Sequence, residues 1–287
     1  MRVVTIASDL DNRFLNELLI PSCAGTGLDL TILHARRRFF QFTDKRTILT
    51  EYLAREARPD ELILFTDAYD TLFVRGPEYI EPAYRRFAQP VVFGAEPNSW
   101  PLGVVGFALY PGHPAGRYPY LNSGGFIGPA GELLELCRRY PTPPSGRFPV
   151  LDQLRGHGYD TDLLFGFSDQ YHWTLVQLLE PASIGLDRDA DLFEYHGPAM
   201  PNVVLKEVVR EREEFKVRGR QSPGYRLERR RLRERLRGPG RAAQLHFASY
   251  LSKAVALDLL DEGLLPDWIT RVCGSRSSVE PAIHTLG

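Results

Sequence analysis

Cysteine is scarce in this chain. The 287 residues include three cysteines, Cys23, Cys137 and Cys273, which lie far apart in the sequence. An odd number of widely separated cysteines argues against a disulfide framework, and their spacing matches no zinc-binding motif. The pattern favours a reducing compartment.

Long hydrophobic runs are also absent. No window approaches about 18 consecutive apolar residues, so we expect no transmembrane helix. The first residues, MRVVTIASDLDNRF, contain only a short apolar stretch before acidic residues follow, which is typical of a strand and not of a signal peptide. We therefore expect a cytoplasmic protein.

A large net charge is lacking too. The formal net charge is −1, with 43% hydrophobic and 25% charged residues. These values are ordinary for a soluble globular protein with a real core. The length allows one large α/β domain or two small ones, and the overall charge indicates no particular partner.

The positive charges are concentrated in one segment. Residues 203–241 hold fourteen Lys and Arg against six Asp and Glu, and residues 227–237 read LERRRLRERLR. Such a segment is strongly helix-forming but has few apolar positions, which favours a solvated or partly disordered helix. The more specific alternative is a docking surface for an acidic polymer or for membrane headgroups.

Strand-like and helix-like segments alternate through the first third of the chain. Apolar runs of strand length are separated by segments with helical spacing of apolar residues. This alternation predicts an α/β fold with a doubly wound, mostly parallel sheet flanked by helices. The predicted strands are residues 3–7, 28–33, 62–65 and 90–95, and the predicted helices are residues 12–22 and 43–58, the latter capped by Thr43 or Asp44.

Two aspartates follow the third of these strands. The apolar run Leu62–Phe65 is followed directly by Asp67 and Asp70. Side chains that follow a buried strand lie at its carboxyl end, where open α/β sheets bind ligands. Carboxylate oxygens suit Mg²⁺ or Mn²⁺, which indicates a cation site. Turn formation or helix capping is the alternative role for these acids.

Five motifs occur in an order that resembles a known family. They are FTDAYDTLF, FGAEPNSWP, YLNSGGFIG, SDQYHWT and IGLDRDADLF. In order and spacing they resemble the glycosyltransferase domain of the multifunctional procollagen lysyl hydroxylases, and the resemblance extends over about residues 3–253. It implies a single GT-A-like domain over residues 1–265, with a basic helical insert at about 203–241 and a C-terminal tail at 266–287.

The resemblance also implies a metal and a donor substrate. The family binds Mn²⁺ (or Mg²⁺) and a UDP-sugar, and the matching metal ligands are Asp67, Asp70 and His246. Without the motif series, His246 would be interpreted as a core histidine. Lys253 follows it at a distance that allows pairing with a phosphate oxygen.

Further donor-binding positions follow from the resemblance. Lys45 matches a lysine that touches the nucleotide, Thr5 and Ser8 would lie near the uracil and ribose, and Tyr69 would either stack on uracil or belong to the core. The wall near the sugar and diphosphate would be formed by Asn122, Ser123, Gly124, Gly125 and Gln170.

The predicted reaction centre departs from the family pattern. Asp169 matches the second acid of an Asp-Asp-Gln run, but the first acid is replaced by Ser168. Asp169 would orient the sugar or acceptor or act as a base, and Glu96 and Trp100 would line the sugar or acceptor side. After His246 the family's two glycines are also replaced, since the chain reads His-Phe-Ala-Ser.

Three function classes follow from these residues. The leading hypothesis is a metal-dependent transfer of a hexose from a UDP-sugar to a hydroxyl, which in the resembled family belongs to hydroxylysine or galactosyl-hydroxylysine of collagen; a collagen-like protein or another glycan is the expected acceptor. The second is a nucleotide-sugar-binding module with a transferase-like fold and little turnover, favoured by Ser168. A nucleic-acid binder using the basic segment is the third, and we expect no nucleic-acid partner.

Overall fold

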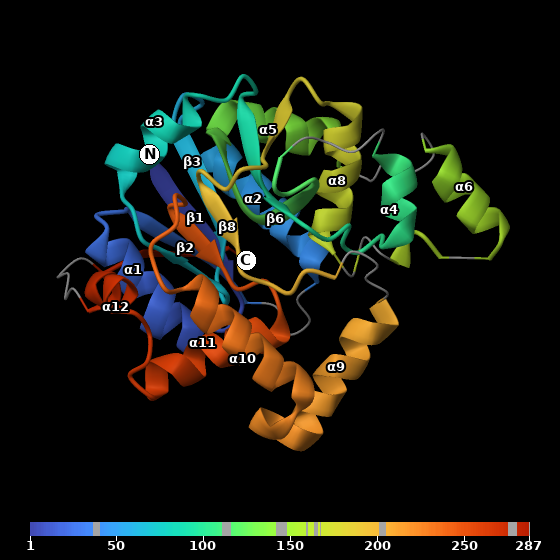
Figure 1. Cartoon of the computed structure of the whole chain (residues 1–287). Coiled ribbons are helices and arrows are strands. Elements are labelled where there is room, and N and C mark those ends of the chain that lie inside the picture. Colours follow the sequence, from blue (N-terminus) through green and yellow to red (C-terminus); the bar gives the residue numbers. More distant parts are fainter. Residues whose placement is uncertain are drawn as a thin grey trace.

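The computed structural model describes residues 1–36, 41–110, 116–141, 148–158, 160–163, 166, 168–200, 205–274 and 280–286. A seven-stranded sheet in the order β10-β2-β1-β3-β6-β5-β7 forms its centre (Figure 1). The strands are β1 (Arg2–Ala7), β2 (Leu30–Ala35), β3 (Leu62–Asp67), β5 (Val91–Glu96), β6 (Tyr120–Pro129), β7 (Ile184–Asp187) and β10 (Ala282–Leu286).

The central sheet is mostly parallel. β1 pairs in parallel with β2 and β3, and β5 pairs in parallel with β7, whereas β6 runs antiparallel to both β3 and β5. The predicted α/β fold class with a mostly parallel sheet is therefore confirmed. A second sheet of three strands consists of β4 (Thr71–Phe73), β9 (Gln244–His246) and β8 (Phe193–Tyr195), in that order.

Helices cover both faces of the central sheet. One face packs against α2 (Phe42–Arg55), α5 (Ala130–Arg139) and α8 (Asp169–Leu179), and the other against α1 (Ile20–Gly25) with the π-helical turn Leu15–Leu19 and α3 (Pro77–Tyr84). Alternate strand residues supply the two cores: Ile63 and Phe65 belong to the first, and Leu64 to the second. Two short helices, α4 (Val104–Leu109) and α6 (Pro149–Gly156), lie together beyond α8 (Figure 1).

The N-cap of α2 lies two or three residues before the predicted one. Gln41 is the N-cap residue in place of Thr43 or Asp44, and the Gln41 backbone N–H donates to the Asp44 carboxylate over 2.8 Å. Asp44 is thus the third residue of a capping box, which satisfies backbone N–H groups at the start of the helix. This cap fixes the first turn of α2, which carries Lys45.

The basic insert is better packed than its composition predicts. It forms α9 (Leu205–Arg218), a 3₁₀ turn (Gly219–Gln221) and α10 (Pro223–Arg235), which lie beside α11 (Tyr250–Asp261) (Figure 1). Tyr225 and Leu232 are buried in one apolar cluster with α11. The helix predicted there is present in α10, but it is solvated on one face only, because a few apolar residues at helical spacing are enough to attach the other face.

The segment expected as a C-terminal tail belongs to the fold. Residues of α12 (Asp267–Cys273) pack against α1, and β10 pairs in parallel with β2, with Ala282 opposite Thr31. The domain therefore extends beyond the predicted boundary at residue 265. Among the described residues, none of the helices is both long and apolar enough to cross a membrane.

Candidate metal and donor site

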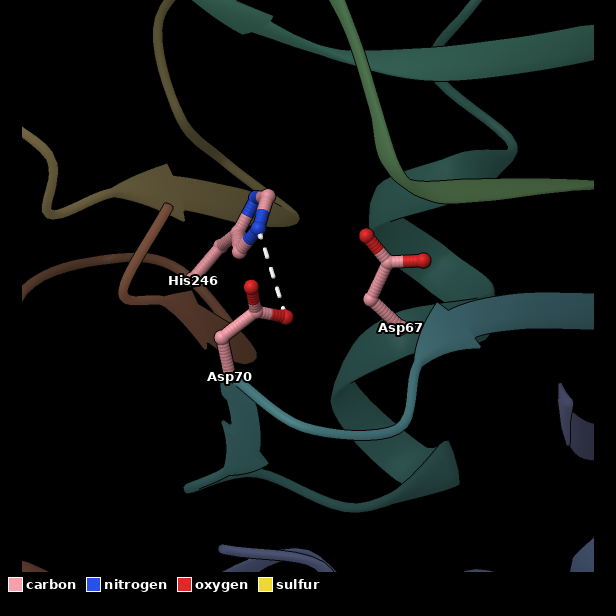
Figure 2. A group of neighbouring side chains, drawn as sticks. All are labelled: Asp67, Asp70 and His246. Carbon is pink, nitrogen blue, oxygen red and sulfur yellow. Dashed lines mark ion pairs between the residues drawn. The ribbon is translucent and has the colours of Figure 1, made fainter. Parts of the chain in front are cut away.

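Two strand ends and one turn bring three predicted metal ligands together. Asp67 ends β3, Asp70 precedes β4, and His246 ends β9. β4 and β9 pair with Thr71 opposite His246, which carries the imidazole to the two aspartates. One ligand atom from each of the three side chains lies within 4.8 Å of the others, and Figure 2 shows Asp70 beside His246 with Asp67 facing them.

The atoms of this cluster suit a divalent cation. Oδ1 of Asp70 is buried and has no hydrogen-bond partner among the described residues, although it lies 3.6 Å from Nε2 of His246. A buried carboxylate oxygen without a partner is costly, and a cation would provide the missing interaction. Two carboxylates and one imidazole leave further positions for phosphate oxygens on Mn²⁺ or Mg²⁺.

Asn122 holds the imidazole in one orientation. Its Oδ1 lies 2.9 Å from Nδ1 of His246 and also accepts the Gly124 N–H, while its Nδ2 donates to Glu96. Because Oδ1 can only accept, Nδ1 must carry the proton. A neutral His246 therefore presents the lone pair of Nε2 to the side where Asp70 lies, as a metal ligand requires.

Gly124 leaves the space that this imidazole occupies. A Cβ at position 124 would lie 2.1 Å from Cε1 of His246. Any side chain there would displace the ring, so the glycine is required by the close approach and not by an unusual backbone angle. The small residue that we predicted in the wall near the sugar therefore makes room for His246, a predicted metal ligand.

Two lysines neutralise the aspartates. Nζ of Lys45 lies 2.5 Å from Asp67 and 3.9 Å from Asp169, and Nζ of Lys253 lies 3.1 Å from Asp70. Burial raises the pKa of Asp70, but Lys253 and His246 outweigh it and hold the pKa below its usual range. Burial lowers the pKa of His246, and Asp70 reverses this so that the pKa is raised. Both ammonium groups therefore lie beside the carboxylates of the predicted metal site.

Asp169 lies at the start of α8, facing Lys45. Burial raises its pKa, the Lys45 ammonium opposes this, and Asp67 raises it further, with a net upward shift. A carboxyl group whose pKa is raised by its surroundings is a candidate acid or base. Ser168, which replaces an acid of the family pattern, is the N-cap of α8, since its hydroxyl accepts the Tyr171 N–H.

Glu96 supports neighbouring side chains. It is 3% exposed, and its Oε1 accepts hydrogen bonds from Asn122 over 3.0 Å and from Gln170 over 2.7 Å. Its Oε2 accepts one from Asn98 over 3.1 Å. Burial raises the pKa of Glu96, and these amide donors oppose the shift. We predicted Glu96 on the sugar or acceptor side; its geometry is that of a residue that positions Asn122 and Gln170.

A cavity of about 310 Å³ opens beside the metal cluster. This is a size at which small-molecule sites occur. Predicted site residues that line it are Lys45, Asp67, Asp70, Glu96, Trp100, Asn122, Ser123, Gly124, Asp169, Gln170, His246 and Lys253. Val208, Glu211 and Arg212 of α9 also line the cavity, and we had not predicted them. Glu211 and Arg212 lie three and four residues after Val208, so all three share one face of the helix. This spacing was the feature of the sequence that could have identified them.

Four predicted residues do not appear in this lining of the described structure. The Thr5 hydroxyl is buried and donates to the Thr66 carbonyl over 2.7 Å, within the sheet. The Tyr69 hydroxyl accepts the Ser8 N–H over 2.7 Å, which connects the turn after β1 to the turn between Asp67 and Asp70. A Cβ at Gly125 would lie 2.2 Å from Oε1 of Gln244, so this glycine faces the small sheet.

Comparisons with known proteins relate the chain to one family. A sequence profile described as the PLOD GT domain matches residues 43–143. Procollagen-lysine,2-oxoglutarate 5-dioxygenase 1 of Mus musculus is 32% identical over 167 residues, and procollagen-lysine,2-oxoglutarate 5-dioxygenase 2 of Homo sapiens is 31% identical over 170 residues. Both alignments cover 56% of this chain and 20% of the relative, so the chain spans about a fifth of the length of these relatives.

One solved structure with a similar arrangement is the apo form of mouse xyloside xylosyltransferase 1. It aligns with a TM-score of 0.44 and 9% sequence identity, over 85% of this chain and 96% of that chain.

Proposed function

Because the chain is related to the PLOD GT domain through residues 43–143, we propose that it is a metal-dependent glycosyltransferase. It moves a hexose, glucose or galactose, from a UDP-sugar to a hydroxyl acceptor. The observation that carries this proposal is the convergence of Asp67, Asp70 and His246 within 4.8 Å beside a cavity. A collagen-like protein or another glycan would supply the hydroxyl.

The three ligands would hold Mn²⁺ or Mg²⁺. A divalent cation there would stabilise the negative charge that develops on the diphosphate leaving group, a contribution of several kcal/mol. Two lysines beside the carboxylates would bind the diphosphate. Lys45 pairs with Asp67 and Lys253 pairs with Asp70. Both ammonium groups would bind phosphate oxygens as point charges.

Asp169 is the acid we assign to the reacting sugar or acceptor. It lines the same cavity as Asp67, Asp70 and His246, and its pKa is raised, mainly because the side chain is buried. In this position it would orient the donor sugar, or take the proton that the acceptor hydroxyl loses. Trp100 lines the cavity as well and would give the sugar an apolar surface.

A nucleotide-sugar-binding module with little turnover is the second candidate. It is favoured by Ser168, which caps α8 where the family pattern has an acid. The one remaining carboxylate, Asp169, cannot serve both to orient the sugar and to act as a base. In this case the metal cluster would bind the nucleotide, and the sugar would stay attached.

A donor screen with Mn²⁺ separates the two candidates. UDP-glucose and UDP-galactose are incubated with the protein and Mn²⁺, and release of free sugar is measured without an added acceptor. A transferase should release sugar slowly, EDTA should abolish the release, and Asp70→Ala should do the same. Asp60→Ala changes an exposed aspartate and is the matched control. UDP binding without sugar release from any donor would favour the module.

A further inference from the structure

One face of α10 carries a stripe of arginines. Three of them, Arg226, Arg230 and Arg233, are separated by four and three residues, which places them on the same side of the helix. Arg237 lies in the turn just after the helix ends, and all four arginines are exposed. At about 1.5 Å per residue the stripe is roughly 16 Å long. This basic stripe consists of Arg226, Arg230, Arg233 and Arg237.

The opposite face of α10 explains why these arginines point outward. Tyr225 and Leu232 are buried against α11, and the Arg231 guanidinium donates to the carbonyls of His196 and Gly197. The helix is therefore attached to the protein by Tyr225, Leu232 and Arg231. The basic stripe is left to solvent.

The stripe has no acidic partner in the part of the chain that the structure describes. The four guanidinium groups form no ion pair or hydrogen bond there, whereas the neighbouring Arg229 pairs with Glu262 and Arg231 with Glu228. Like charges three or four residues apart destabilise a helix by a few tenths of a kcal/mol per pair. An external anionic surface would relieve this repulsion.

The surroundings of the stripe fit a lipid surface. Its side chains, with those of Arg229 and Glu234, border an open groove of about 480 Å³ that would accommodate headgroup phosphates. Leu227, on the same helix and next to Arg226, is 58% exposed. The described residues that border the groove include no aromatic side chain on which a nucleic-acid base could stack.

We propose that the basic stripe of α10 docks the protein on an anionic lipid membrane, with Leu227 entering the headgroup layer. Clusters of four or more basic residues on a helix are attracted to anionic lipids, and an exposed leucine adds apolar contact. The helix lies on the surface and does not cross it. This surface is separate from the metal cluster, so it brings the protein to lipid without taking part in the proposed transfer.

Vesicle sedimentation of the full chain tests the proposal. Vesicles of phosphatidylcholine with phosphatidylserine should bind the protein, and vesicles of phosphatidylcholine alone should not. Binding should fall as salt rises from about 0.1 M, since the screening length shortens. Each arginine contributes roughly fivefold near an anionic surface, so changing all four stripe residues to Gln should weaken binding by about 600-fold if the contributions add. The matched control changes four scattered exposed arginines to Gln: Arg55, Arg58, Arg85 and Arg138.

Leu227 distinguishes lipid from other polyanions. Leu227→Ser should weaken vesicle binding threefold or more and leave binding to heparin unchanged. Equal losses in the stripe variant and in the control variant would overturn the proposal, as would binding that does not depend on phosphatidylserine. Stripe-dependent binding of a DNA duplex that exceeds vesicle binding and ignores Leu227→Ser would also overturn it and assign the stripe to nucleic acid.

Discussion

Nδ1 of His246 lies 2.9 Å from Oδ1 of Asn122, so the amide decides which imidazole nitrogen faces the aspartates. The orientation of Asn122 is itself set from two sides, because the Gly124 N–H donates to its oxygen and its nitrogen donates to Glu96. A chain of hydrogen bonds therefore runs from the buried Glu96 carboxylate to His246, the proposed metal ligand. Such partners tune a ligand without touching the metal.

Asn122→Ala should weaken Mn²⁺ binding by about 10- to 100-fold, because loss of a supporting hydrogen bond frees the imidazole to rotate and to change tautomer. Calorimetric titration of Mn²⁺ in the presence of UDP measures the effect. Asn16→Ala removes an exposed amide that donates to the Leu10 carbonyl, and it should leave the affinity unchanged. An unaltered Mn²⁺ affinity in Asn122→Ala would contradict the role assigned to the amide.

Asp70→Asn and His246→Ala should each weaken Mn²⁺-dependent UDP binding at least tenfold, about the lower limit expected even for a residue that only supports a ligand. In Asp70→Asn the Lys253 ammonium also loses its charged partner at 3.1 Å, so UDP binding should be measured with and without Mn²⁺. The difference between the two isolates the metal. Asp60→Asn is the control, and unchanged affinity in both site variants would refute the metal assignment.

The positions of Asp67 and Asp70 could be predicted from local sequence pattern, whereas that of His246 could not. The apolar run of β3 ends at Asp67, so the position of both aspartates at a strand end follows from the sequence. His246 lies about 180 residues further on, and only the family resemblance pointed to it. The match at residues 43–143 confirms that resemblance for the segment that holds both aspartates. The support of the imidazole by Asn122 depends on pairing between distant strands, which no local pattern reveals.

The predictions from sequence were wrong mainly about how segments with few apolar residues pack against the rest of the fold. α10 reads as a solvated helix because most of its positions are charged, yet Tyr225 and Leu232 attach it to α11. β10 is five residues long and pairs with β2, a contact between opposite ends of the chain. Long-range contacts of this kind decide burial, and the sequence carries only a faint signal for them.

Asp169→Asn should leave UDP binding intact and lower turnover a hundredfold or more, in line with the loss of a positioned acid or base. Binding should persist because Lys45 keeps its closer partner, Asp67, at 2.5 Å. Sugar release and UDP affinity are measured on the same preparation. An equal loss of UDP affinity would show instead that Asp169 serves to hold Lys45 in place.

His172 should make the protein less stable at acidic pH. Its side chain is buried in α8, neither ring nitrogen has a hydrogen-bond partner among the described residues, and burial lowers its pKa to about 2, with Arg46 contributing. An unfolded histidine binds a proton below about pH 6.5, whereas the folded one stays neutral, so stability falls as the pH falls through that value. Between pH 7 and pH 5 this amounts to about 2 kcal/mol.

His172→Phe should therefore remove about 2 kcal/mol of the stability difference between pH 7 and pH 5, as measured by urea unfolding at both values. The variant keeps a ring of similar shape against Trp173, which His172 meets edge-on with ring centroids 5.3 Å apart. His157→Phe, at an exposed position, should retain the full pH dependence. If His172→Phe retains it as well, other groups must account for the acid sensitivity, and His196, whose pKa burial lowers to about 3, is the next to change.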